Sequence, residues 1–374
     1  MSNSFPNIIC TISNDITTDR RMQRICESLV DFGSNVTLVG FRKKHSAPLD
    51  NMHYKTVRLN QLFNKGFLFY AEINIRLFFF LLKTKFDIVN SVDTDTVLAC
   101  FLVSKIKNKR IIFDAHEFFP GVPELEGKPF KRFFWQMVER LTLPHIRHNY
   151  TVSESLKKLY ESQTGQIYQV IRNLPKKSDF SGKLFNQTQN FDKKICYLGA
   201  LNKGRGLENA IKALKILPVN FKLLLVGGGD LEKTLKSLTI DLDLTERVQI
   251  TGWVKPSEIS HLLGGCHLGL NLLDGNSDSY RVSLANKVFD YIHHSIPCIT
   301  MNFEEYKKLN EEFNCFVLTD SIEPGLIGRI IIDLFEDNEK YILLCKNAQL
   351  ASLALNWETE SQKLKNIYFL NTQD

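Results

Sequence analysis

Short apolar runs alternate with segments of helical periodicity along most of the chain. The β-branched run at residues 8–12 is typical of a buried parallel strand. After a polar loop, Met22, Ile25 and Leu29 recur at helical spacing before Gly33. The same pattern predicts strands over 36–39, 87–90, 110–113, 149–152 and 168–171, and helices over 96–105 and 130–142. This alternation predicts a doubly wound α/β unit.

A second series of the same kind follows a polar stretch at residues 176–194, which we interpret as a linker. It predicts strands over 195–199, 221–226, 248–251, 268–272 and 298–300, and a helix over 207–214. A length of 374 residues also suits two domains. We therefore expect an α/β fold of two Rossmann-like, doubly wound domains that face each other across a cleft. The predicted domains are residues 1–175 and 176–356, with a C-terminal helix over about 357–374 that packs back on the first domain.

Composition narrows the class of protein. Hydrophobic residues make up 44% and charged residues 24%, which excludes a largely disordered chain. The net charge of +6 favours an anionic ligand or membrane face without indicating nucleic acid. The eight cysteines form no C-x-x-C pair, so we expect a reducing cytosol, no disulfide and no cysteine metal site. The most apolar stretch, residues 67–86, carries charged side chains, and no signal peptide is visible, so a soluble or peripheral protein is expected.

The most distinctive local pattern is the segment 283–291. It predicts a helix that begins near Ser283, buries Val288 and Phe289, and presents Asn286, Lys287 and Asp290 on its opposite face. A helix N-terminus beside a lysine favours an anion, and a carboxylate there suits ribose hydroxyls. The simpler alternative is a solvated helix face with an ion pair between Lys287 and Asp290. Spacing alone leaves both interpretations open.

Three further loops lie where predicted strands end. Residues 199–206 are glycine-rich and offer Lys203 and Arg205 to a diphosphate, although they match neither a Walker loop nor G-x-G-x-x-G. Gly227-Gly228-Gly229-Asp230 allows close approach of a sugar or phosphate. In both loops the glycines have a purely conformational alternative. In the third, His116 and Glu117 follow a strand of the first half, where a histidine is either catalytic or simply packed.

Two patterns resemble metal sites. Asp93-Thr94-Asp95 is a D-x-D triplet, but it opens a predicted helix, so we interpret Asp93 or Thr94 as its cap. His293-His294 lacks further ligands at metal spacing. We therefore predict no metal site.

Taken together, these stretches resemble a family 4 glycosyltransferase of the GT-B fold. In the second half the resemblance lies in "YLGALNKGRGLENAIKAL", "LLLVGGGD", "VQITGWV" and "SLANKVFDYIHHSIPCI". In the first half it lies in "NDITTDRRMQRICESL", "DAHEFFPGVPEL" and "TVSESL". It implies retaining transfer of a sugar from a nucleotide-diphosphate sugar, with no cofactor and no metal, an acceptor-binding first domain and a donor-binding second domain.

The resemblance also implies roles for individual residues. Arg205 and Lys287 would contact the donor diphosphate, Asp290 would hold the ribose, and His116 would lie near the transferred sugar; His116, Arg205 and Lys287 form the predicted catalytic set. The predicted donor-binding residues are Gly199, Lys203, Arg205, Gly227, Gly229, Gly252, Val254, Ser283, Asn286, Lys287 and Asp290. The predicted acceptor-side residues are Asn14, Asp15, Asp19, Arg20, His116 and Glu117.

The chain departs from the family pattern at two points. The first acidic position of the E-x7-E signature is Val282, and the second is Asp290 rather than glutamate. Asp274 or Asp278 could supply the missing carboxylate. The first loop offers Ser13-Asn14-Asp15 in place of a double glycine, which we interpret as the mark of a subtype.

The expected partners are a nucleotide sugar and a glycan or lipid-linked glycan acceptor, without nucleic acid, in cell-surface polysaccharide synthesis. We expect a cytoplasmic protein. The aromatic residues of 67–80 with the basic cluster Lys105, Lys107, Lys109 and Arg110 could contact an anionic membrane at the inner face of the plasma membrane. Alternatively, these aromatics are core. The alternative functions are a GT-B-fold nucleotide-sugar epimerase and a non-catalytic nucleotide-sugar-binding subunit, while an NAD-linked dehydrogenase lacks its glycine fingerprint.

Overall fold

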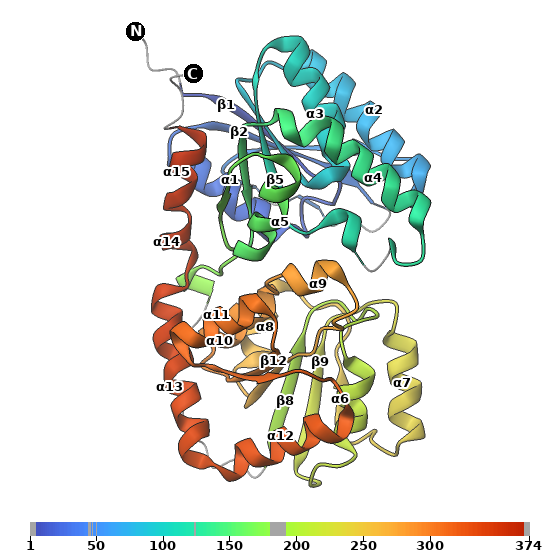
Figure 1. The fold of residues 1–374 in the computed structure, drawn as a ribbon, viewed down its shortest axis with the longest axis vertical. Helices are drawn as coiled ribbons and strands as arrows, with labels where there is room; N and C mark the ends of the chain where they lie inside the picture. The colour runs from blue at the N-terminus through green and yellow to red at the C-terminus, as the bar shows by residue number, and fades with distance from the viewer. Residues whose placement is uncertain are drawn as a thin grey trace. The chain divides into compact units, whose positions relative to one another are not determined.

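The computed structural model describes residues 5–43, 46, 48–49, 51–122, 125–179 and 192–369. The chain divides into two compact units, one formed by Met1–Asn173 with Ser361–Asp374 and the other by Leu174–Glu360 (Figure 1). Each unit is built around one parallel sheet with helices packed against it. The predicted fold class, two Rossmann-like α/β domains, is confirmed.

The first unit contains a seven-stranded parallel sheet in the order β3-β2-β1-β4-β5-β6-β7. Its strands are β1 (Asn7–Thr11), β2 (Asn35–Arg42), β3 (Lys55–Asn60), β4 (Ile88–Val92), β5 (Arg110–Ala115), β6 (His148–Thr151) and β7 (Tyr168–Val170). Strand order reverses between the neighbours β1 and β4, so the loops after these two strands diverge at the carboxyl edge of the sheet. All six strands predicted in this half are present, and β3 is an additional edge strand.

The helices of the first unit follow the strands in alternation. They are α1 (Arg20–Asp31), α2 (Phe67–Lys83), α3 (Asp93–Lys107), α4 (Pro129–Thr142) and α5 (Glu154–Thr164). Because crossovers between parallel strands are right-handed, α1 lies on one face of the sheet, and α2, α3 and α4 lie on the other. The last three lie side by side in Figure 1. Among the described residues, no helix combines the length and the apolar character needed to cross a bilayer.

The second unit contains a six-stranded parallel sheet in the order β10-β9-β8-β11-β12-β13. Its strands are β8 (Lys193–Leu198), β9 (Phe221–Val226), β10 (Val248–Ile250), β11 (Leu268–Asn271), β12 (Cys298–Met301) and β13 (Phe316–Thr319). Its helices are α6 (Leu207–Leu214), α7 (Glu232–Asp241), α8 (Pro256–Leu263), α9 (Asp278–Val282), α10 (Asn286–His293), α11 (Glu304–Phe313), α12 (Pro324–Glu336), α13 (Asn338–Ala354) and α14 (Trp357–Glu360). Strand order reverses between β8 and β11, the switch point at which ligands of such sheets bind.

The predicted linker is shorter than expected. Strand β8 already begins at Lys193, inside the stretch interpreted as linker, and residues 180–191 lie outside the described residues. The strand is predicted from residue 195 and begins two residues earlier, because the first two residues of β8 are half-buried lysines that carry no apolar signal.

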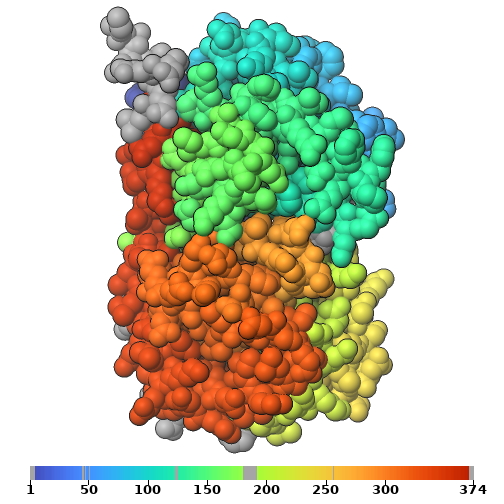
Figure 2. All heavy atoms as spheres, viewed as in Figure 1, coloured from blue at the N-terminus to red at the C-terminus, as the bar shows by residue number. Residues whose placement is uncertain are grey.

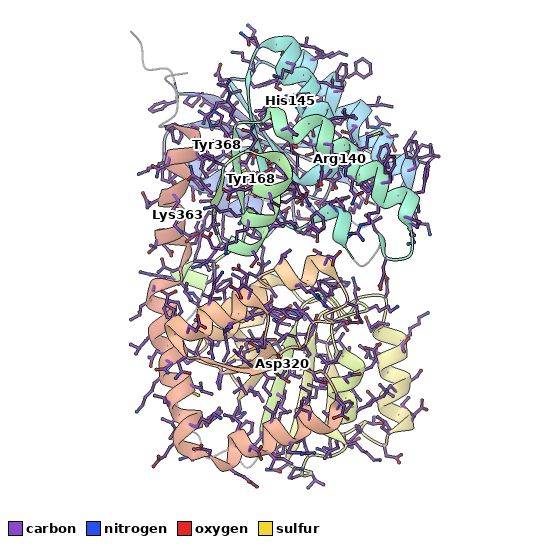
Figure 3. The ribbon with its side chains drawn as sticks, in the orientation of Figure 1. Arg140, His145, Tyr168, Asp320, Lys363 and Tyr368 are labelled. Carbon is purple, nitrogen blue, oxygen red and sulfur yellow. The ribbon has the colours of Figure 1, made fainter. Side chains whose placement is uncertain are left out.

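The chain returns to the first unit at its C-terminal end through α15 (Gln362–Tyr368), close to the return predicted at about residue 357. The Arg110 guanidinium donates hydrogen bonds to the carbonyls of Ile367 and Tyr368. The hydroxyl of Tyr368, which Figure 3 labels on α15, lies 3.2 Å from that of Tyr150. Arg110 therefore anchors this segment, and its assignment to a basic surface cluster is wrong.

Candidate functional site

The carboxyl edge of the second sheet brings together the loops that follow β8, β9 and β10. The Leu201 N–H donates to the Gly228 carbonyl at 3.0 Å, and the Gly199 N–H donates to Val226 at 2.9 Å. Gly227 in turn forms an isolated antiparallel bridge with Gly252. These backbone contacts hold three glycine-bearing loops against one another beside the β8/β11 switch point.

The glycines of this edge are required by close backbone packing. Gly227 has a φ of +138°, and a Cβ there would lie 2.0 Å from the Gly199 carbonyl oxygen. A Cβ on Gly229 would lie 2.5 Å from the Asn202 amide oxygen. Both contacts are shorter than real Cβ atoms make, so the conformational explanation of these two glycines holds whether or not a ligand is bound.

Lys287 points into this edge from α10. The buried Tyr291 hydroxyl accepts the Leu198 N–H at 3.0 Å and thereby fixes α10 against β8. Lys287, one turn before Tyr291, is only 5% exposed, and its Nζ lies 3.8 Å from the centroid of the Tyr197 ring. The prediction that Lys287 lies on the face opposite Val288 is wrong, because this lysine is buried on the sheet side.

Among the residues that the structure describes, no acceptor is hydrogen-bonded to the Lys287 ammonium. Burial, reinforced by the positive charge of Arg205, lowers the pKa of Lys287 well below its ordinary value. Asp290 raises this pKa, but by less than burial and Arg205 lower it. The predicted alternative, a solvated ion pair between Lys287 and Asp290, therefore does not describe this lysine.

Arg205 supplies a second cation next to Lys287. Its guanidinium carbon lies 4.9 Å from the centroid of the Tyr280 ring, and its buried Nε has no hydrogen-bond partner in the described part of the chain. The positive charges of Arg205 and Lys287 repel each other, and each side chain packs on the face of a tyrosine ring. Together they form an electropositive site that favours binding of an anion. A diphosphate would supply acceptors for both.

The other predicted donor-binding residues are more dispersed. Helix α10 begins at Asn286 rather than near Ser283, whose hydroxyl instead donates to the Tyr280 carbonyl at the end of α9. The Asn286 and Lys203 side chains are exposed, and Val254 packs against the core of the unit. Gly252 has a φ of +70° with open space beside it. Asp290 is half-buried on α10.

Asp274 lies beside the arginine loop. Its N–H donates to the Gly204 carbonyl at 2.8 Å, and its carboxylate accepts the Asn276 N–H at 3.0 Å. It lines a cavity of about 560 Å³ with Arg281 and Asp320. Of the two carboxylates considered as substitutes for the missing acidic residue, Asp274 is thus joined directly to the loop that carries Arg205.

The first unit holds a separate charged cluster at the carboxyl end of β5. His116 Nε2 lies 2.9 Å from the Asp114 carboxylate, which also accepts from the Arg21 guanidinium at 3.0 Å. Arg21 and Asp114 are both buried, so this is a buried ion pair with a histidine attached. Burial lowers the pKa of His116, but Asp114 and then Asp93 outweigh it and raise this pKa to about 9.

Asp93 does not cap the helix that it begins. The N-cap position of α3 is Val92, and no side chain makes the capping hydrogen bond. The Asp93 carboxylate instead accepts the His116 N–H at 2.7 Å, and its backbone adopts a φ of +57°. The capping interpretation of Asp93 or Thr94 is therefore wrong, since Thr94 donates to Glu139 at 2.6 Å. Asp93 orients His116.

The remaining predicted acceptor-side residues mainly stabilise their own loops. Asp15 forms a buried ion pair with Arg58 at 2.8 Å, and Asp19 caps α1 by accepting the Met22 N–H. The Asn14 carbonyl accepts from Phe41, the Arg20 carbonyl accepts from Arg24, and the Glu117 carbonyl accepts from Tyr160. Of the predicted set, the structure gives only His116 a position in the charged cluster.

Neither metal-like pattern gathers further ligands. His293 and His294 donate to the carbonyls of Leu355 and Asp290, respectively. Across the part of the chain that the structure describes, no group of three His, Cys, Asp or Glu side chains is arranged to hold a metal ion.

Comparison with protein families matches both halves of the chain. The model of glycosyl transferases group 1 matches residues 182–350, and the model of Glycosyltransferase Family 4 matches residues 18–173. The chain is a GT-B glycosyltransferase of the family 4 type. Its cation pair therefore lies in the group 1 half of this glycosyltransferase, and its histidine cluster lies in the family 4 half.

Solved structures support the fold at low sequence identity. Sucrose-phosphate synthase from Thermosynechococcus elongatus has a TM-score of 0.81 and 15% identity, over 97% of this chain and 98% of that one. HepE from Anabaena, in complex with UDP and glucose, has a TM-score of 0.76 and 14% identity, over 96% and 98%. WaaG, a glycosyltransferase involved in lipopolysaccharide biosynthesis, has a TM-score of 0.68 and 13% identity, over 97% and 99%. No curated protein matched the sequence of the glycosyltransferase.

Sequence reasoning missed several residues that build these two clusters. Tyr197 and Tyr280 carry the ring faces under Lys287 and Arg205, and Arg21 and Asp114 hold His116. Tyr197 and Asp114 lie inside sequence motifs that were recognised because of neighbouring residues. Their position in those motifs was the signal that could have identified them as site residues. Arg21 also lies inside a recognised motif, next to Arg20, whereas Tyr280 carried no such signal, because only the fold brings it to the cation pair.

Proposed function

We propose that this glycosyltransferase transfers a sugar, with retention of anomeric configuration, from a nucleotide-diphosphate sugar to a glycan or lipid-linked glycan. The observation that carries the proposal is the buried Lys287 ammonium, which lies beside Arg205 and has no hydrogen-bond acceptor within the described ranges. A buried cation without an acceptor is costly unless a ligand supplies one. A diphosphate at this position would satisfy Lys287 and the free Nε of Arg205 together.

The proposed chemistry uses these cations in the transition state. As the bond between the sugar C1 and the β-phosphate oxygen breaks, negative charge develops on that oxygen. Lys287 and Arg205 would stabilise this charge as pre-positioned donors in a buried setting. The acceptor hydroxyl would attack C1 from the face that the phosphate leaves, and its proton would pass to the departing phosphate. No enzyme nucleophile is required, and we propose that the two side-chain cations serve in place of a divalent metal.

His116 is the proposed catalytic residue of the first unit. The Asp114 and Asp93 carboxylates favour its imidazolium form at neutral pH. An imidazolium could donate hydrogen bonds to hydroxyls of the transferred sugar, and that is the role we propose for it. We further propose that the acceptor belongs to cell-surface polysaccharide synthesis in the cytoplasm, in keeping with eight free cysteines.

The base-binding part of the donor site is proposed to lie after β10. Trp253 is 76% exposed there, and its indole Nε1 would lie 2.6 Å from a Cβ placed on Gly228. The other two tryptophans, Trp135 and Trp357, are buried. Ligand quenching of tryptophan fluorescence would therefore report mainly on Trp253. Because HepE was solved with UDP and with UDP-glucose, uridine nucleotides are the first donors to test.

The test is a titration followed by product analysis. UDP, GDP and inorganic pyrophosphate are titrated against wild type and Trp253→Phe, and a thermal-shift panel of nucleotide sugars is run in parallel. A ligand at about 100 times its dissociation constant adds ~2.7 kcal/mol of stability. Binding of a nucleotide sugar that is lost in Lys287→Met supports the donor site, and absence of binding by every nucleotide contradicts the proposal. With a bound donor, release of a free epimerised sugar in place of a glycosylated acceptor would indicate the epimerase alternative.

A further inference from the structure

Helices α2, α3 and α4 of the first unit expose large apolar side chains to solvent. In α4, Phe130 is 84% exposed and Leu141 is 61% exposed. Phe130, Phe133, Met137 and Leu141 recur at helical spacing, so they form one stripe along the helix. The opposite side of α4 buries Trp135 and Val138 against the unit. The solvent face of a helix packed on a globular core is normally polar, so this second apolar stripe has no role in the fold described here.

Helix α2 carries a similar exposed stripe. Leu68, Ile75 and Phe79 are each more than half exposed, while Ile73 and Leu77 face the core. The exposed residues line a groove of about 770 Å³ beside the end of β3. The rings of Phe67 and Phe134 lie 5.7 Å apart and connect the two helices at one end. The predicted alternative that these aromatics are core residues is therefore wrong for Phe67 and Phe79.

The helices of the first unit differ in whether they expose large apolar side chains. None of the large apolar residues of α1 and α5 that the structure describes is exposed, whereas α2, α3 and α4 expose a series of them. Figure 2 shows the atoms of α2 to α4, coloured light blue to green, as one continuous part of the surface of this unit. Among the described helices of this unit, the exposure of large apolar side chains is thus concentrated in α2, α3 and α4.

The same layer is strongly basic. Helices α2 to α4 contain seven basic residues, which are Arg76, Lys83, Lys105, Lys107, Lys131, Arg132 and Arg140. Of their four acidic residues, Asp95 and Glu139 are buried, Asp93 binds the His116 N–H, and Glu72 accepts from two backbone N–H groups and from Arg76. Arg140, labelled on α4 in Figure 3, is exposed. The accessible charge of this layer is therefore positive.

We propose that this surface, called here the apolar–basic face, docks on an anionic lipid bilayer. The face is defined by Leu68, Ile75, Phe79, Phe130, Phe133 and Leu141, with Lys131 and Arg140 among its cations. Aromatic and aliphatic side chains gain by entering the acyl boundary, while lysine and arginine side chains interact with anionic headgroups. A second copy of the chain would bring like charges together, and a hydrophilic polyanion would leave the apolar side chains in water. A bilayer satisfies both features of the face.

The docking proposal goes beyond the proposed function and does not depend on the donor, because the face lies wholly in the first unit. The test is flotation of the full chain with phosphatidylcholine vesicles and with vesicles that also contain phosphatidylglycerol. We expect flotation only with the anionic vesicles and a decrease as salt is raised. Each of Lys131→Gln and Arg140→Gln should weaken vesicle binding roughly fivefold. Phe130→Ser with Phe133→Ser should reduce flotation much further.

Matched controls come from the second unit. Val219 is 81% exposed and Lys233 is exposed, so Val219→Ser and Lys233→Gln make the same kinds of change on another surface. Both control variants should float with the anionic vesicles to the same extent as the wild type. Circular dichroism and nucleotide titration of every variant would show that both units remain folded. Absence of wild-type flotation overturns the proposal, as does equal flotation of Phe130→Ser with Phe133→Ser. A dimer in light scattering that dissociates in these variants would also overturn it, because the occupant would then be a second copy.

Discussion

The Lys287 ammonium lies over the Tyr197 ring, 3.8 Å from its centroid, and no described residue offers it a hydrogen-bond acceptor. A buried cation of this kind opposes folding of the empty protein and favours binding of an anion. Lys287→Met should therefore weaken binding of the nucleotide donor by about 1.5–3 kcal/mol, the size of a hydrogen bond to a charged group. In the absence of ligand the same variant should have a higher Tm than the wild type, because the cost of burying the charge is removed.

Calorimetric titration and thermal unfolding would measure these two opposite effects. Lys233→Met provides the control, since Lys233 lies on the surface of the same unit. It should change neither donor affinity nor Tm appreciably. Unchanged donor affinity in Lys287→Met would remove Lys287 from the site. A lower Tm in that variant would show that the ammonium is stabilised in the free protein.

The depressed pKa of Lys287 has a second consequence, which concerns pH. Burial and Arg205 lower the pKa of Lys287 in the free protein, whereas a bound diphosphate would raise it. Donor binding should therefore take up protons above the free-state pKa of Lys287, and affinity should fall as pH rises through that value. The stability of the free protein should depend on pH in the opposite direction to donor affinity. The unfolded lysine binds more protons, so the free energy of unfolding should rise with pH between the folded and unfolded pKa values.

Calorimetry in buffers of different ionisation enthalpy would detect this proton uptake. Lys287→Met should show neither the uptake nor the accompanying loss of affinity at high pH. If the wild type and this variant have the same pH profile, another group is responsible for it.

The close packing of Gly227 against the Gly199 carbonyl gives a prediction about stability. Gly227→Ala places a Cβ 2.0 Å from the Gly199 carbonyl oxygen at a φ of +138°. We expect a loss of about 1–3 kcal/mol from this overpacking, with weaker nucleotide binding because the loop of Arg205 must shift. Gly265→Ala is the matched control, since a Cβ there would contact nothing within 4 Å. Chemical denaturation of both variants tests the prediction, and equal stabilities would show that the two loops are not coupled by this contact.

The sequence predicted the architecture better than the site. Apolar runs such as 221–226 and 268–272 are buried on both faces of a parallel sheet, so they can be recognised without knowledge of their neighbours. The edge strand β3 is only half-buried, and its run KTVRLN therefore carries little hydrophobic signal. Helical periodicity also failed at Lys287. A lysine is normally assigned to the solvent face, and only the packing of Tyr291 against β8 turns this position inward.

The charged cluster around His116 gives the last prediction. Asp114→Asn removes the carboxylate shared by Arg21 and His116 and leaves a buried guanidinium without its counter-charge. We expect the first unit to lose about 3–5 kcal/mol, as in other buried ion pairs that lose one partner. The pKa of His116, raised to about 9 in the wild type, should fall because Asp114 is the larger of the two carboxylate effects that raise it.

The sign of the pH dependence follows from the raised pKa of His116. The contribution of its pairing to stability is complete below the unfolded value near 6.5 and is lost as pH rises through about 9. The stability difference between wild type and Asp114→Asn should therefore shrink over this range and leave the part due to Arg21. Imidazole titration by NMR and denaturation at several pH values measure the two effects separately. Glu154→Gln, which removes a partly exposed ion pair with Lys157, should cost at most about 1 kcal/mol. A His116 resonance that titrates identically in wild type and Asp114→Asn would contradict the proposed control of this imidazole by Asp114.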